Sequence, residues 1–152
     1  MHRLTTAMRW VLFACIVWVT ALIFIQVIFR NTGISISGFD EMIGIAAIWT
    51  YFLGMALATR MNGHIEGGLN ELIHNDGLKK LLRAVSMIAL LVFSAIGLAL
   101  SIQSLATTYE HDYRTLYYEL PVAISIWALV VGFALNIVFI VVSFFERKEA
   151  EG

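Results

Sequence analysis

The stretch WVLFACIVWVTALIFIQVIF, residues 10–29, decides the fold because its twenty residues include no charged side chain. A helix of about 20 residues crosses the roughly 30 Å hydrocarbon core of a bilayer. Three further runs also lack Asp, Glu, Lys, Arg and His: 43–59, 84–108 and 122–145. A charge at mid-bilayer costs about 2.5–3.5 kcal/mol, so this absence is informative. The sequence predicts an all-α membrane protein with four transmembrane helices, at about residues 10–29, 40–60, 84–108 and 121–145.

The composition supports one integral membrane domain over residues 1–152, since the chain is 60% hydrophobic. A net charge of −1 argues against a nucleic-acid partner. The first run follows two arginines, as in a secretion signal, but it is too long for one and no small-x-small cleavage site follows. We therefore expect it to be an uncleaved anchor.

The positive charges predict the orientation in the membrane. Of ten Lys and Arg residues, only Arg30 and Arg114 lie in the first and third loops. The other eight lie before the first span, between the second and third, or after the fourth: Arg3, Arg9, Arg60, Lys79, Lys80, Arg83, Arg147 and Lys148. Cytoplasmic loops are enriched in Lys and Arg. Both termini are therefore expected in the cytoplasm, with the acidic pair Asp40-Glu41 on the outer side.

The loops carry local signals of their own. Ser37-Gly38-Phe39-Asp40 resembles a capping box in which Asp replaces Glu, which predicts that the second span begins near Gly38. Asp40 and Glu41 then lie in the first turn, where the helix dipole favours acids. A partner-facing role for this acidic pair stays open beside that interpretation.

The second loop, residues 61–83, predicts a short interfacial helix on the cytoplasmic membrane surface. Its apolar residues fall on one helical face: Ile65, Leu69, Leu72 and Ile73. The basic residues after it are expected to meet anionic lipid headgroups: Lys79, Lys80 and Arg83.

The third loop is rich in tyrosine. Tyr109, Tyr113 and Tyr117 are spaced by four, which predicts an interfacial tyrosine belt along one edge of a helix that continues the third span. A docking surface for an external partner is the alternative. Pro121 suits the first turn of the fourth span.

The four spans lack the groups that several membrane chemistries need. All four histidines lie outside the apolar runs, which argues against haem ligation within the membrane. One cysteine is too few for a disulfide oxidoreductase. No span carries the acid that a proton-coupled exporter requires. We expect no catalytic, cofactor-binding or metal-binding residue.

The mild polar groups and small residues in the spans predict helix packing. Polar side chains such as Ser94 and Asn136 usually make one hydrogen bond between membrane helices. Stripes of small residues permit close approach of backbones. Three such stripes occur: Gly54 and Ala58; Gly97 and Ser101; and Ala128, Gly132 and Asn136. We expect at least one stripe, by preference that of the fourth span, to receive a helix of another protein. Internal packing of either stripe within this chain is the alternative.

One stretch resembles a known family, the small membrane subunit of tripartite ATP-independent periplasmic (TRAP) transporters. Residues 40–65 read DEMIGIAAIWTYFLGMALATRMNGHI, in which the signature is Asp40, Glu41, Gly54, Arg60 and His64. Two shorter matches are QVIFRN at 26–31 and Leu120-Pro121 followed by Trp127. One departure is Gly44, where family members often carry arginine.

The resemblance implies a division of labour in the bacterial inner membrane. A large multi-span subunit carries the substrate and sodium sites, and a periplasmic substrate-binding protein delivers an organic acid or related solute. The small subunit is no enzyme; it anchors the large subunit and itself holds no cofactor. The residues expected at assembly contacts are Asp40, Glu41, Gly54, Arg60, His64, Pro121, Trp127, Ala128, Gly132 and Asn136. Two alternatives stay open: a self-contained small homo-oligomeric transporter and a membrane assembly factor.

Overall fold

The computed structural model describes residues 2–33, 37–61 and 76–150, which form four helices. These are α1 (His2–Asn31), α2 (Phe39–Arg60), α4 (Asp76–His111) and α5 (Ala123–Ala150). Each contains a stretch long and apolar enough to cross a membrane, which confirms the four predicted spans. The predicted interfacial helix and His64 lie outside the described residues.

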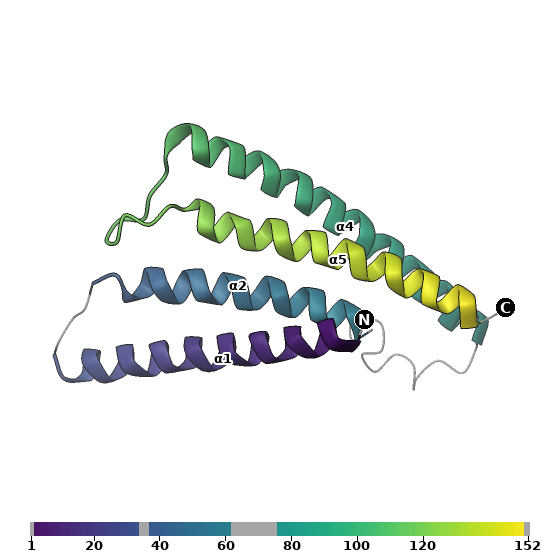
Figure 1. Cartoon of the computed structure of the whole chain (residues 1–152), viewed down its shortest axis with the longest axis horizontal. Helices are drawn as coiled ribbons and strands as arrows, with labels where there is room; N and C mark the ends of the chain where they lie inside the picture. The colour runs from purple at the N-terminus through teal and green to yellow at the C-terminus, as the bar shows by residue number, and fades with distance from the viewer. Residues whose placement is uncertain (1, 34–36, 62–75, 151–152) are drawn as a thin grey trace.

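The helices form a single open layer in the order α1, α2, α5, α4, and not a closed four-helix bundle (Figure 1). Helix α2 packs on α1 and on α5, and α5 packs on α4. Helices α1 and α4 are therefore the two edges of the layer. The N- and C-termini lie at the same end of it (Figure 1). We call this the inner end and the opposite one the outer end, after the predicted topology.

The buried core runs along α5. Within the most apolar window of each span, 39% of residues are buried in α5, against 6% in α1. The buried apolar side chains come from all described helices except α4: Leu22, Ala56, Leu57, Ala123, Ala128, Phe133, Phe139 and Ile140. Helix α4 contributes small polar residues instead, including Ser94 and Ser101. One layer of helices leaves most of each span available to lipid or to another protein.

Glycines set the spacing between α5 and its two neighbours. A Cβ placed on Gly132 would lie 2.6 Å from the Cβ atom of Phe52 and 3.1 Å from its carbonyl oxygen. A Cβ on Gly97 of α4 would run into the ring of Phe133. The Phe133 ring lies between those of Phe52 and Phe93, with centroids 5.2 and 5.8 Å away. Only glycine allows these helices to approach so closely.

The expectation that the stripe of the fourth span faces a partner is wrong. Ala128 is 1% exposed, Asn136 is fully buried, and Gly132 is buried against α2. The chain's own helices cover this stripe because α5 lies inside the layer, between α2 and α4.

A buried hydrogen bond also joins α5 to α4. The Asn136 Nδ2 group donates to Ser94 Oγ over 2.7 Å, and Ser94 Oγ donates to the carbonyl oxygen of Leu90. This confirms the expected pairing of polar side chains between spans. Other hydroxyls bond within their own helix, as Thr50 does to Ala46 and Ser101 to Gly97.

Candidate functional site

The acidic pair at the outer end connects three parts of the chain. The first member, Asp40, accepts a hydrogen bond from Gln26 Nε2 through its Oδ1 atom, over 2.6 Å. Gln26 lies near the end of α1 and Asp40 in the first turn of α2. The rings of Phe29 and Phe39 meet beside this bond, with centroids 6.5 Å apart. Asp40 thus holds the two helices together where the chain turns between them.

The second member, Glu41, binds the segment between α4 and α5. Its Oε1 atom accepts the backbone N–H of Tyr117 over 2.8 Å, and its Oε2 atom accepts that of Tyr118 over 3.2 Å. An ionised carboxylate that takes two N–H donors forms stronger hydrogen bonds than a neutral acceptor. Glu41 therefore attaches a segment that is 76 residues away in the chain to the start of α2.

Residues 112–122 form a compact hairpin, which we call the outer hairpin. Arg114 and Pro121 pair as an antiparallel bridge. Thr115 N–H donates to the carbonyl oxygen of Leu120 over 2.8 Å, and Val122 N–H to that of Tyr113 over 3.0 Å. The Leu120 N–H donates to Thr115 Oγ1. These bonds fix the turn that presents its N–H groups to Glu41.

The outer hairpin replaces the predicted helical tyrosine belt. Helix α4 ends at His111, and Asp112 follows with a φ of +46°, so Tyr113 and Tyr117 no longer lie along a helical edge. The Arg114 Nε group lies 3.0 Å from the Asp112 carboxylate, and this hydrogen bond raises the pKa of the guanidinium. Pro121 precedes α5, which begins at Ala123, so its predicted place in the first turn is wrong.

Gly38 makes the close approach of the hairpin possible. It is the N-cap of α2 with a φ of +97°, a conformation that favours glycine. A Cβ at this position would lie 2.6 Å from Cε2 of Tyr118. The predicted capping box is wrong, because no side chain caps this helix end and the acid of the box, Asp40, accepts its hydrogen bond from Gln26 instead.

Aromatic side chains gather around the outer hairpin. Trp127 Nε1 donates to the hydroxyl of Tyr109 over 3.1 Å, which joins α5 to the last turns of α4. The hairpin tip is open, with Leu116 84% exposed and the tyrosines beside it exposed as well. The indole and phenol groups suit a membrane–water boundary, where amphipathic rings are enriched.

The other predicted assembly residues lie apart from this cluster. Gly54 faces α1, where a Cβ would lie 3.8 Å from the methyl groups of Leu12. Arg60 is the last residue of α2, at the inner end. Lys79, Lys80 and Arg83 lie in the first turns of α4, but their side chains lie outside the described part, so their lipid contacts stay a prediction. Among the described residues, no group of three His, Cys, Asp or Glu side chains is placed to hold a metal.

Residues 19–149 match the sequence profile of the DctQ component of tripartite ATP-independent periplasmic transporters. The chain belongs to this family. The match extends from the middle of α1 to the end of α5, so it includes the outer hairpin and its Glu41 contact. The DctQ component is a small membrane subunit of a TRAP transporter. No curated protein and no solved structure shows significant similarity to the chain.

Proposed function

We propose that this DctQ component is the scaffold that anchors the large transport subunit of a sodium-coupled TRAP transporter for an organic acid or related solute. Two observations support this proposal: the chain belongs to the DctQ family, and its helices form an open layer. Among the described helices, each edge helix packs mainly on one neighbour. A subunit built in this way offers wide apolar surfaces to a second membrane protein.

The character of the spans supports a scaffold over a self-contained transporter. The apolar runs hold no charged residue, and the four described helices continue through their spans without a break. Secondary transporters typically build their substrate and ion sites from interrupted helices near the bilayer midplane. The sodium and substrate sites therefore belong to the large subunit in this proposal.

The edge helix α4 offers a specific contact for the large subunit. Its outer half and the start of the outer hairpin form a polar hollow of about 330 Å³, which is lined by Gln103, Ser104, Thr107, Thr108 and Tyr113. The two threonines donate to carbonyl oxygens of their own helix. No hydrogen bond of the Gln103 amide to another described residue is found, and this side chain is exposed. Because a polar amide in hydrocarbon gains from a partner, we propose that the large subunit supplies one.

The remaining partners and the location follow from the same assignment. We propose an inner-membrane complex with both termini in the cytoplasm and with a periplasmic substrate-binding protein on the side of the outer hairpin. Reporter fusions at Gly152 and in residues 112–122 test the orientation. A periplasmic signal from the Gly152 fusion overturns it.

Reconstitution tests the scaffold function. Liposomes would receive the full chain alone, the large subunit alone, or both together, and sodium-driven uptake of C4-dicarboxylates, sialic acids and other organic acids would be measured with the binding protein present. We expect uptake only with both subunits and copurification of the two. Uptake by this chain alone would favour the self-contained transporter. Full uptake by the large subunit alone, with this chain needed only during its production, would favour an assembly factor.

A further inference from the structure

The tip of the outer hairpin presents apolar surface that the protein's own contacts leave open. The Leu116 side chain is 84% exposed, and no other large apolar side chain in the described ranges is exposed to this extent. Tyr117 and Tyr118 follow it and are also exposed. Tyrosine is enriched where proteins bind one another, because its ring adds apolar area and its hydroxyl a hydrogen bond. An exposed leucine beside two tyrosines therefore has the composition of a protein contact.

The hairpin is held in one conformation before any partner arrives. The Glu41 carboxylate accepts the N–H groups of Tyr117 and Tyr118, the two residues directly after Leu116. The Tyr118 ring also lies so close to Gly38 that a Cβ there would be 2.6 Å from it. A surface that is already ordered loses less conformational entropy when it binds. Glu41 is thus a positioning residue for the tip.

The charges near the tip favour a protein partner over lipid. Glu110, Asp112 and Glu119 are exposed. The one basic residue between 109 and 122 is Arg114, and its Nε atom lies 3.0 Å from the Asp112 carboxylate. Three acids and one base give this segment a net charge of −2 with His111 neutral. Anionic lipid surfaces attract basic segments, so an acidic rim suits a soluble protein with basic side chains instead.

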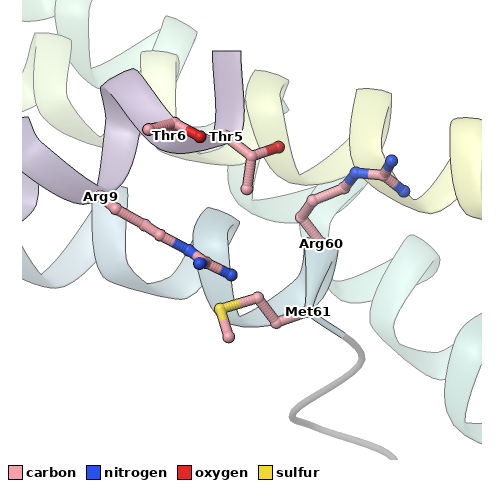
Figure 2. A pocket seen from close by; sticks show the side chains of 5 residues that line it. All are labelled: Thr5, Thr6, Arg9, Arg60 and Met61. Atoms are coloured by element: carbon pink, nitrogen blue, oxygen red, sulfur yellow. The ribbon is translucent and has the colours of Figure 1, made fainter. Parts of the chain in front are cut away.

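The inner end of the layer has the opposite charge. A cleft of about 460 Å³ there is lined by Thr5, Thr6, Arg9, Arg60 and Met61, none of them acidic (Figure 2). Thr5, Thr6 and Arg60 interact with other groups of the protein, and Figure 2 shows the Arg60 guanidinium directed away from Arg9, so we assign no ligand to this cleft. A partner with a basic surface is therefore repelled from the inner end and attracted to the outer end.

We propose that the outer hairpin is the surface of this subunit on which the periplasmic substrate-binding protein docks. The inference rests on the proposed function, which names this partner and places the hairpin on its side of the membrane. Leu116 and the two tyrosines contact an apolar depression of the binding protein. Basic side chains around that depression face the acidic rim, Glu110, Asp112 and Glu119.

Binding of the purified substrate-binding protein tests this docking surface. The complex of the full chain with the large subunit would be held in nanodiscs, and association and dissociation followed by biolayer interferometry at low and at physiological salt. The variant is Leu116→Ala, and the matched control is Leu81→Ala, which shortens an exposed leucine near the inner end of α4. We expect Leu116→Ala to weaken binding about fivefold or more, as at a binding hot spot. Leu81→Ala should bind as the wild type does.

Two further variants separate the rim charge from the positioning of the tip. Glu119→Lys should slow association about tenfold at low salt, and the difference should shrink as salt screens the charges. Glu41→Gln keeps Leu116 and its tyrosines but loosens the hairpin, so it should mainly speed dissociation. In uptake assays each variant should raise the concentration of binding protein that gives half-maximal uptake and leave the maximal rate unchanged.

The outcomes distinguish this proposal from the scaffold function. Unchanged binding by Leu116→Ala and Glu119→Lys, with normal copurification of the large subunit, overturns the docking surface and leaves the scaffold function in place. If the wild-type chain does not copurify with the large subunit, the scaffold function fails, and the same binding measurements on the chain alone decide the docking surface. A spin label on Leu116→Cys, in a Cys15→Ala background, would also overturn it by colliding more with oxygen than with a water-soluble nickel complex, because the tip then lies in lipid.

Discussion

Replacing Gly132 with alanine tests the close contact between α5 and α2. The added Cβ would lie 2.6 Å from the Phe52 Cβ and 3.1 Å from the Phe52 carbonyl oxygen, so α2 has to shift. Overpacking of this kind typically costs about 1–3 kcal/mol. In a helix without such a neighbour, glycine to alanine instead stabilises by up to about 1 kcal/mol. Gly132→Ala is therefore expected to lose about 0–3 kcal/mol of the free energy of unfolding.

Gly44→Ala is the matched control. Gly44 lies inside α2, and a Cβ there meets nothing within 4 Å. The same atom is added at both positions, so the difference between the two variants isolates the contact with Phe52. Reversible unfolding in mixed detergent, followed by circular dichroism, would measure both free energies. We expect Gly132→Ala to be less stable than Gly44→Ala by about 1–3 kcal/mol. Equal stability of the two variants would refute the close approach of α5 and α2.

Three further predictions concern single side chains. Glu41→Gln should speed amide hydrogen exchange in the outer hairpin, since a neutral amide offers one acceptor oxygen for two N–H donors. The control Glu110→Gln should leave this exchange unchanged, and equal protection of the hairpin in both variants would contradict the Glu41 contact. Asn136→Leu should lower the free energy of unfolding by about 0.6 kcal/mol, which is the average for a hydrogen bond between membrane helices. A loss well above about 2 kcal/mol would mean that Asn136 does more than bind α4. Gln103→Leu should reduce copurification with the large subunit while the lone chain still inserts, and unchanged copurification rules out the polar hollow of α4 as the contact.

The helices could be predicted from the sequence because each depends on a local property. Charge-free runs of membrane-spanning length are visible without any knowledge of tertiary contacts. The end of α4 is also a local property, but the spacing of four between the tyrosines led to the prediction that the helix continues past His111. The signal was His111-Asp112, since Asp tolerates the left-handed conformation that Asp112 adopts after the helix. A period of four indicates a helical edge only while the helix continues.

The roles of the acidic pair could not be predicted in the same way. The dipole argument is correct about where Asp40 and Glu41 lie, in the first turn of α2. It does not reveal that Glu41 binds backbone N–H groups of a distant turn. Every residue except proline has a backbone N–H group, so the residue types do not show which of these groups Glu41 binds. Gly38 was one indication of this contact in the sequence. A glycine directly before a helix indicates a close neighbour or a left-handed residue, and here it provides both.

The order of the helices in the layer changes how the small-residue stripes are interpreted. A stripe shows that something packs closely but not which chain supplies it. Because α5 returns between α2 and α4, Gly132 meets Phe52 and Gly97 meets Phe133, and both stripes serve the chain's own contacts. Surfaces for other molecules are then left on the two faces and at the edges of the layer. The polar hollow lies on one edge helix, α4, where a second membrane protein can reach it.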